Sequence, residues 1–461
     1  MVRIFRHYLS AKLMFIVGLE AIVIVLAIRL GLAFNVHGPV GDGNADMPLV
    51  TCVMFTLAML LILNAIGLYR PDDWDNHRSV RLRLLTTAVL VAGPVFLVTN
   101  FPSDLFGDTR SFAIMVVAIL AGVTFVRFVF YRLAGVAYKP RVLVLGTGSR
   151  VVEFSQMAGQ SRNCTIVGFV ALPTAEQPCV PSSQILGRSS SESLLGLVKK
   201  HSIDQIVIGM TDRRGSLPLN ELVECKLAGV AITELATAFE REYRQVSLES
   251  ITASWIVLEE GFDQGVWRST IKRIFDLAAS GLLLILTLPV IVIAALCIFI
   301  ESGSPVLYRQ ERVGEGGRVF SMYKLRSMRQ DAECDGTPRW AAVKDTRTTA
   351  VGRVIRKLHI DELPQIINVF KGDMSFVGPR PERPYFVDKL VKEIPYYSLR
   401  HTIKPGITGW AQVRYSYGAS LEETSDKLRY DLYYVKNHAL FLDLVILLAT
   451  VEVVFTGKGA R

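Results

Sequence analysis

Adjacent carboxylates close to a rigid, arginine-bearing turn are the residues of this sequence best suited to chemistry. Asp361 and Glu362 stand side by side, and Pro379, Arg380 and Pro381 follow on the C-terminal side. Carboxylates can bind Mg²⁺ or attack phosphorus, and an arginine can hold a phosphate through two parallel hydrogen bonds. The two prolines restrict the backbone on both sides of Arg380, which lowers the entropy lost when that side chain binds a ligand. Because a long apolar segment precedes these groups, they indicate phosphoryl transfer to or from a lipid.

Further charged side chains lie in the same part of the sequence. Lys324, Arg326, Arg356 and Asp431 accompany the carboxylate pair within one small module. Their density favours a functional site, whereas the alternative is a helix with an ordinary solvated charged face. A second turn-rich segment, 404–410, offers a hydroxyl, backbone amides and an aromatic ring to a ligand. The alternative there is a structural loop with its tryptophan packed in the core.

The composition is that of a basic, strongly apolar protein. The chain has 461 residues, room for about three domains, and 51% of them are hydrophobic. Its net charge is +9, and residues 302–461 carry 25 Lys and Arg against 18 Asp and Glu. Beside apolar segments, this excess favours anionic lipid or a nucleotide-sugar over nucleic acid as the partner. The six cysteines form no CxxC pair and no zinc spacing, which indicates free thiols in a reducing compartment.

Apolar runs in the N-terminal part predict membrane-spanning helices. They cover residues 13–34, 48–68, 84–101 and 112–131, each close to the ~20 residues needed to cross a bilayer. The distribution of Lys and Arg between the runs places both ends of this bundle in the cytoplasm, and we expect no cleavable signal peptide. Glu20 and Arg29 interrupt the first run. They can mark a functional pocket, although such residues more often pair inside a bundle or extend to the interface.

The middle of the chain predicts a soluble, doubly wound α/β domain. Buried-strand runs alternate with helical segments at 141–145, 165–170 and 203–208. The turn Gly146-Thr-Gly148 follows the first strand and could cradle a pyrophosphate. Val151 stands where the third glycine of a dinucleotide fingerprint belongs, so we expect a Rossmann-like scaffold without a redox cofactor.

Two further apolar runs lie on either side of the charged module. The run 275–300 is long enough to span a membrane, and Pro289 lies near its middle. Two interpretations stay open: a spanning helix with a kink, or a helix that enters one leaflet, bends at the proline and leaves on the same side. The run 439–455 carries Asp443 and Glu452 and predicts an interfacial or docking helix.

Six motifs in the C-terminal part follow one another in an order that is specific to one enzyme family. They are KRIFD from Lys272, YKLRSM from Tyr323, DELP from Asp361, KGDMSFVGPRP from Lys371, KPGITGWAQ from Lys404 and YDLYYV from Tyr430. On these motifs, residues 272–461 resemble the bacterial sugar transferases, the monotopic polyprenyl-phosphate phosphoglycosyl transferases. Nearly the whole chain is similar to the large subclass, in which four transmembrane helices and a Rossmann-like domain precede the catalytic module.

The resemblance implies a membrane α/β fold with three parts. These are a four-helix transmembrane bundle at 1–138, a Rossmann-like doubly wound domain at 139–263, and a monotopic catalytic module at 264–461. The module is expected to contain a re-entrant helix at 272–301, bent at Pro289. Relatives carry a Ser-Pro or similar pair at the bend, where this chain has Leu288-Pro289.

The resemblance also implies a two-step transfer. Asp361 attacks the sugar-bearing phosphorus of a UDP-sugar, UMP leaves, and undecaprenyl phosphate then attacks the phosphosugar-aspartate. Glu362 is the second catalytic residue, and both carboxylates are expected to hold Mg²⁺, which screens the diphosphate. Arg380 is expected to bind nucleotide phosphate or base, and Arg356 a lipid or sugar phosphate. The other expected substrate-binding residues are Lys324, Arg326, Pro379, Pro381, Thr408, Trp410, Gln412 and Asp431.

The resulting expectation is a multi-pass transferase of the bacterial inner membrane that begins exopolysaccharide or other glycan synthesis. Its donor is expected to be UDP-glucose or another UDP-hexose, with the Rossmann-like and catalytic domains on the cytoplasmic side. The expected partners are the UDP-sugar, undecaprenyl phosphate and the lipid bilayer; a homodimer stays open, and nucleic acid is not expected. Two alternatives are a nucleotide-sugar oxidoreductase or epimerase that uses residues 141–210, and a non-enzymatic scaffold of an export machine.

Overall fold

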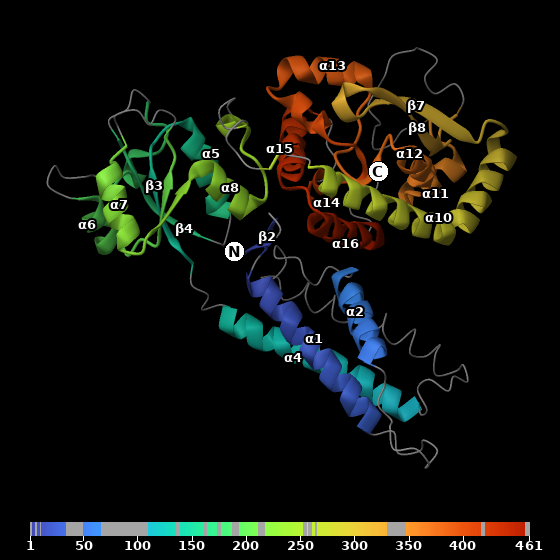
Figure 1. Cartoon of the computed structure of the whole chain (residues 1–461), viewed down its shortest axis with the longest axis horizontal. Helices are drawn as coiled ribbons and strands as arrows, with labels where there is room; N and C mark the ends of the chain where they lie inside the picture. The colour runs from blue at the N-terminus through green and yellow to red at the C-terminus, as the bar shows by residue number, and fades with distance from the viewer. Residues whose placement is uncertain are drawn as a thin grey trace. The chain divides into compact units, whose positions relative to one another are not determined.

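The chain forms two compact units. The computed structural model describes residues 2–4, 7–9, 11–33, 49–65, 109–134, 139–160, 164–172, 177–186, 193–210, 217–251, 256, 261–262, 265–329, 347–415 and 420–456 (Figure 1). The first unit comprises residues 1–136, 264–427 and 437–461. The second comprises residues 137–263 together with the short segment 428–436.

The second unit is built on a parallel sheet, as the alternating strand and helix pattern predicts. Its strands are β3 (Arg141–Leu145), β4 (Thr165–Val170), β5 (Gln205–Ile208) and β6 (Ala231–Glu234), in the order β4-β3-β5-β6. Every neighbouring pair is parallel. The connecting helices are α5 (Ser149–Gln160), α6 (Leu194–Lys200), α7 (Leu219–Leu227) and α8 (Leu235–Tyr243), with short 3₁₀ turns η2 (Ser182–Gln184) and η3 (Leu248–Ser250).

The two faces of this sheet are covered by different helices. Figure 1 shows α5 and α8 on one side of the sheet and α6 and α7 on the other. Val142 and Val144 of β3 pack with side chains of α5 and α8, whereas Leu143 and Leu145 pack with those of α6 and α7. Successive side chains of a strand point to opposite faces, so one apolar strand supplies both cores. The predicted doubly wound α/β arrangement is therefore confirmed for this unit.

The glycine-rich turn after β3 departs from a dinucleotide fingerprint in a way that the structure explains. Val151 is fully buried, and its side chain occupies the place where a Cβ on Gly209 would lie, 2.4 Å from its Cγ2 atom. The close approach of strand and helix that a third glycine normally allows is thus provided by Gly209 after β5. Gly146 has φ +118°, a conformation that favours glycine.

The N-terminal part of the first unit contributes apolar helices. They are α1 (Ala11–Ala33), α2 (Leu49–Ala65) and α4 (Thr109–Ala134), preceded by an antiparallel pair of strands, β1 (Val2–Ile4) and β2 (His7–Leu9). Their shared core includes Ile24, Met59 and Ile119. Glu20 of α1 and Arg127 of α4 form a buried ion pair at 2.7 Å, so Glu20 pairs inside the bundle, as the more common alternative predicted.

One helix stands out as a candidate membrane segment. Among the described residues, α10 (Val266–Ser302) is the helix long and apolar enough to cross a bilayer, judged by length and composition. Shorter apolar stretches occupy 52–64 in α2 and 114–130 in α4. The predicted third run, 84–101, lies outside the described residues.

The rest of the first unit packs around α10. It contains the hairpin β7 (Leu307–Val313) and β8 (Val319–Leu325), with η4 (Glu315–Gly317) between them, and the parallel pair β9 (Ser375–Val377) and β10 (Gly406–Thr408). Its helices are α11 (Ala350–Lys357), η5 (Ile360–Gln365), α12 (Ile366–Lys371), α13 (Pro384–Glu393), η6 (Tyr397–Thr402), α14 (Trp410–Arg414), α15 (Leu421–Asn437) and α16 (Leu440–Thr456). Residues 428–436 of α15 belong to the second unit.

Both ends of α10 dock on this small module. Near the first end, Arg273 donates to the carbonyl oxygens of Val369 and Phe370 at the C-terminus of α12. Near the other end, Ile298 belongs to a core cluster with Leu325 and Ile355. Figure 1 shows that the helix changes direction between these ends, and Pro289 lies inside it. A straight helix of 37 residues would be about 55 Å long, so a bend lets both ends reach one module.

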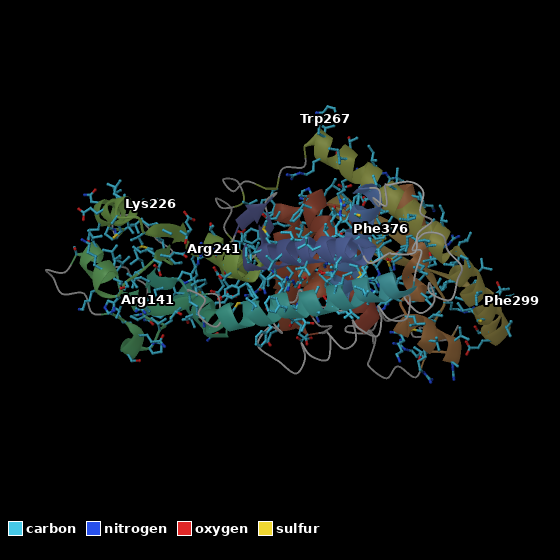
Figure 2. All side chains as sticks on the ribbon, turned by 90° about the horizontal axis from the view of Figure 1, so that it is seen from below. Arg141, Lys226, Arg241, Trp267, Phe299 and Phe376 are labelled. Atoms are coloured by element: carbon cyan, nitrogen blue, oxygen red, sulfur yellow. The ribbon has the colours of Figure 1, made fainter. Side chains whose placement is uncertain are left out.

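The surface of α10 is apolar where it leaves the module. Leu282, Ile285 and Leu286 are each more than half exposed. Trp267 and Phe299, near the two ends of the helix, are also exposed and lie on its outer side (Figure 2). Exposed apolar area of this extent marks a surface that contacts lipid or another apolar partner.

The last helix, α16, is a docking helix, as predicted. Its Asp443 accepts a hydrogen bond from Lys272 of α10 at 2.8 Å, and both side chains are largely buried. Asn64 of α2 donates to the carbonyl oxygen of Leu448 at 3.1 Å. The Asp443 charge, which makes 439–455 an unfavourable membrane span, is thus paired with Lys272 inside the module.

Candidate active site

The carboxylate pair lies on a short 3₁₀ helix that follows α11. Asp361 and Glu362 are in the first turn of η5, and Asp361 is 8% exposed. His359 forms the turn between α11 and η5 with φ 56°, in the left-handed region that non-glycine residues seldom adopt. This turn directs the two carboxylates toward β8 and the proline-flanked arginine.

Glu362 is held by two cations. Its Oε1 atom accepts hydrogen bonds from Lys324 Nζ at 2.9 Å and from Arg380 Nη2 at 2.5 Å, and its Oε2 atom accepts one from Arg380 Nη1 at 3.2 Å. Burial opposes ionisation of this carboxyl, but Arg380 and then Lys324 outweigh it and hold the pKa of Glu362 well below its usual range. Glu362 is therefore an ionised carboxylate that accepts three hydrogen bonds from cations.

Asp361 has the opposite environment. Among the described residues, none forms a hydrogen bond or ion pair with its carboxylate. Burial raises the pKa of Asp361, and the neighbouring Glu362 adds to this, while Lys324, Arg380 and Arg356 act in the opposite direction. A buried carboxylate that accepts no hydrogen bonds, but is close to cations, is well suited to act as a nucleophile toward an anionic substrate.

Lys324 is placed by a residue that the sequence interpretation missed. Asn368 of α12 is fully buried; its Oδ1 atom accepts from the Tyr323 N–H at 3.0 Å, and its Nδ2 atom donates to the Ser321 carbonyl at 2.7 Å. The side chain thus fastens α12 to the edge of β8 beside Lys324. An asparagine on the buried face of an otherwise apolar helix is the signal that could have found it.

The position of Arg380 is also set by a residue outside the predicted set. Arg400 donates from Nη2 to the Arg380 carbonyl at 2.8 Å and from Nη1 to the Tyr397 hydroxyl at 2.6 Å. Pro379 and Pro381 flank Arg380, and the Pro381 carbonyl accepts from Arg312 at 2.9 Å. The turn is therefore held by its backbone, which leaves the Arg380 guanidinium to meet Glu362.

Arg356 is the cation near Asp361 that Glu362 does not engage. It lies in the last turn of α11 and is partly exposed, and its charge partly opposes the rise that burial causes in the pKa of Asp361. Within the part of the chain that the structure describes, its guanidinium has no ion-pair or hydrogen-bond partner. It is therefore available to a second anion beside the carboxylate.

Other predicted site residues have structural partners. Arg326 donates from Nη2 to the carbonyls of Ser302 and Gly303 and to the Ser302 hydroxyl, at the C-terminal end of α10. Trp410 is 1% exposed, and the Arg414 guanidinium lies over its ring at 4.6 Å, so the packed-core alternative describes this side chain.

The remaining predicted contacts lie on β10, α14 and α15. Thr408 shares a hydrogen bond with Thr450 of α16 at 2.7 Å, and Gln412 donates to the Ile407 carbonyl at 3.2 Å. Asp431 is buried in the segment that belongs to the second unit. Roles for these residues in substrate binding stay predictions.

A magnesium ion fits one of the two carboxylates better than the other. Within the described residues, no group of three or more His, Cys, Asp or Glu side chains gathers to form a protein-only cage. Mg²⁺ is commonly bound by one or two carboxylates together with substrate phosphates. The open carboxylate of Asp361 suits that role, whereas Glu362 already accepts three hydrogen bonds from cations.

Known proteins are similar to this chain over two different lengths. The bacterial sugar transferase family matches residues 267–457. The UDP-glucose:undecaprenyl-phosphate glucose-1-phosphate transferase of Klebsiella pneumoniae is 30% identical over 424 residues, which are 88% of this chain and 90% of that protein. A protein of the same name from Xanthomonas campestris pv. campestris is 32% identical over 343 residues, 69% of this chain and 67% of its own length.

A third relative is more similar over the C-terminal part alone. The UDP-N-acetylgalactosamine-undecaprenyl-phosphate N-acetylgalactosaminephosphotransferase of Aeromonas hydrophila is 49% identical over 191 residues, 41% of this chain. The match spans 45% of that relative, less than half its length. The relatives' names therefore agree on the phosphotransfer to undecaprenyl phosphate and differ in the sugar.

Proposed function

Because the chain belongs to the bacterial sugar transferase family, we propose that it transfers a sugar-1-phosphate from a UDP-sugar to undecaprenyl phosphate and releases UMP. The observation that carries the proposal is the division between the two adjacent carboxylates. Asp361 is buried and its carboxylate has no hydrogen-bond partner among the described residues, while Glu362 is held by Lys324 and Arg380. Asp361 is thus available to form a bond to phosphorus, and Lys324 and Arg380 lie near it to bind the phosphates of the substrate.

The reaction is proposed to proceed in two displacements at phosphorus. An Asp361 oxygen attacks the sugar-bearing phosphorus, the bond to the UMP oxygen breaks, and a phosphosugar-aspartate forms. An oxygen of undecaprenyl phosphate then attacks the same phosphorus and releases the Asp361 carboxylate. The product is undecaprenyl-diphosphate sugar, and no oxidant or reductant is needed.

The cations of the site have separate proposed tasks. Lys324 and Arg380 face the diphosphate of the donor, and Arg356 faces the phosphate of the lipid or the sugar. Mg²⁺, held by Asp361 and the substrate phosphates, would screen negative charge and favour the departure of UMP. All three cations belong to the first unit, as α10 does, which suits a reaction at headgroup depth.

The membrane arrangement is proposed from the same packing. Helix α10 enters and leaves the membrane on the cytoplasmic face, because both its ends dock on one module and its middle is exposed and apolar. The N-terminal helices, with the run 84–101 as the fourth member of the bundle, span the inner membrane. The donor would then reach Asp361 from the cytoplasm.

A UMP-release assay tests the proposal directly. Purified protein in nanodiscs is incubated with undecaprenyl phosphate and, separately, UDP-glucose, UDP-galactose and their N-acetylated counterparts. We expect UMP and a lipid-linked sugar diphosphate with at least one donor, and neither product with the Asp361→Asn variant. Absence of UMP with every donor in folded wild-type protein would contradict the proposal, and the preferred donor identifies the sugar.

A further inference from the structure

Glu362 pairs with two cations through a single carboxylate. Lys324 comes from β8 and Arg380 from the turn after β9, and both donate to Oε1 of Glu362, at 2.9 and 2.5 Å. The side chains of Glu362, Lys324 and Arg380 are 14, 16 and 28% exposed, so solvent screens the cluster only in part. Glu362 therefore joins two segments that are distant in sequence.

This engagement leaves little capacity for a metal ion. A carboxylate offers about four lone-pair positions, and the hydrogen bonds from the two cations use three of those on Glu362. A divalent cation would also have to approach against the positive charge of Lys324 and Arg380. Asp361 is near the same cations, but among the described residues its carboxylate accepts no hydrogen bond, so its lone pairs remain available to a metal ion.

We propose that Glu362 is a positioning residue, which aligns Lys324 and Arg380 beside Asp361 for the donor diphosphate and does not itself ligate the metal or act as a nucleophile. The inference rests on the proposed function and assigns Glu362 a role within it. In this arrangement the Glu362 carboxylate lies between Lys324 and Arg380 and holds both side chains in place.

The physical reason lies in the flexibility of the cations. Lys324 has a four-carbon stem, and its ammonium group has three N–H donors, of which one is used on Glu362. Arg380 meets the carboxylate with two parallel hydrogen bonds, which fix the plane of its guanidinium. With Glu362 neutralised, both side chains lose their alignment and the donor phosphates must order them on binding.

The test uses the full chain in nanodiscs with the preferred UDP-sugar. Glu362→Gln is expected to raise KM for the donor by on the order of ten- to a hundredfold. The rise in Tm that saturating UDP causes in the wild-type protein is expected to be lost. The Mg²⁺ concentration that gives half-maximal UMP release is expected to change less than about twofold, because a positioning residue is not a ligand.

A double-mutant cycle provides a second readout that a merely structural role would not move. The double variant Glu362→Gln/Arg380→Gln is expected to raise KM by less than the product of the two single effects, since part of the effect of Glu362 passes through Arg380 and the rest through Lys324. Glu362→Asp keeps the charge and is expected to restore part of the UDP-induced rise in Tm. If Glu362→Gln does not fold, Glu362→Asp and Arg380→Gln still decide the question through UDP binding. Glu393→Gln, on the exposed face of α13, is the matched charge-removal control.

Three results separate the possible failures. A tenfold or larger shift in the Mg²⁺ midpoint of Glu362→Gln, with UDP binding intact, would show that Glu362 is a metal ligand and overturn the inference. Additive effects of the two substitutions on KM would also overturn it, since Glu362 would not act through Arg380. Wild-type protein that releases no UMP from any donor would instead contradict the proposed function, and the inference would fall with it.

Discussion

Asp276 and Ser375 are 99 residues apart in the chain, yet the Ser375 hydroxyl donates a hydrogen bond to Asp276 Oδ1 at 3.0 Å. The Phe376 N–H donates to the same oxygen at 3.1 Å, and Asp276 is 3% exposed. The first arm of α10 is thereby joined to β9, the strand that leads into the Pro379-Arg380-Pro381 turn. These hydrogen bonds thus tie α10 to the segment that carries Arg380.

Removal of this junction is expected to destabilise the module. Asp276→Ala leaves the Phe376 N–H without its buried acceptor, which costs about 1–3 kcal/mol. The Ser375 hydroxyl can still donate to the Val377 carbonyl at 3.0 Å. We expect a lower Tm in nanodiscs and a higher KM for the donor. Asp276→Asn keeps an acceptor oxygen and is expected to lose less, so equal losses for both variants would contradict the hydrogen-bond explanation.

Asp361 is expected to be required for turnover, and its ionised carboxylate is expected to lower the stability of the fold. Asp361→Asn replaces a carboxylate by an amide of nearly equal volume, so folding and membrane binding should survive and transfer should stop. Because burial raises the pKa of Asp361, its ionised form is less favourable in the folded protein than in the unfolded chain. The variant should therefore have a Tm at or above that of the wild type at neutral pH. Near-normal turnover would remove Asp361 as the nucleophile.

Asp361 and Glu362 are expected to affect the pH dependence of stability in opposite directions. The raised pKa of Asp361 predicts that the first displacement fails at a higher pH than an ordinary aspartate would require. The stability cost of ionised Asp361 is present above its folded pKa and disappears below its unfolded pKa. Glu362, whose pKa is lowered, stabilises the fold above its unfolded pKa, and this is lost as pH falls through the folded pKa.

A comparison of Tm between variants checks these signs. The stability advantage of Asp361→Asn over the wild type should shrink as the pH is lowered from neutral into the acid range. The stability deficit of Glu362→Gln should also shrink, because the wild type loses the ion pair there. An advantage of Asp361→Asn that grows in acid would contradict the burial argument.

The turn before the carboxylates is expected to tolerate only residues that adopt a left-handed backbone. His359 has φ 56° and ψ 20°. His359→Val should cost about 1–2 kcal/mol of unfolding free energy, whereas His359→Asn should cost much less. Chemical denaturation of the two variants measures the difference. Equal stability would mean that backbone strain at this position is unimportant.

Accessibility of single cysteines is expected to distinguish a re-entrant α10 from a spanning one. Gly265→Cys and Glu315→Cys are placed separately in a cysteine-free variant, on either side of the helix. A membrane-impermeant thiol reagent should label neither in intact cells and both after the inner membrane is opened. Labelling of position 315 alone in intact cells would show a true crossing of the ~30 Å hydrocarbon core and contradict the re-entrant arrangement.

The sequence by itself determined the features that depend on local patterns. Apolar strand runs predicted the parallel sheet, because a strand covered by helices on both faces must be apolar throughout. The adjacency of Asp361 and Glu362 and the rigid turn around Arg380 were also visible, because covalent neighbours and proline rings need no tertiary contact. The resemblance then supplied the reaction that such groups perform.

Only the tertiary structure decided how the two carboxylates differ and which charged residues reach them. Adjacent side chains with the same chemistry look equivalent in a sequence, yet Glu362 meets Lys324 and Arg380, while Asp361 stays open. Arg326, from the same motif as Lys324, instead binds the end of α10. Lys324 lies on β8, whereas Arg326 follows the last residue of that strand, so the two side chains meet different partners although they are two residues apart. These distinctions depend on segments brought together from distant parts of the chain, because ion pairs are set by three-dimensional distance and burial rather than by spacing.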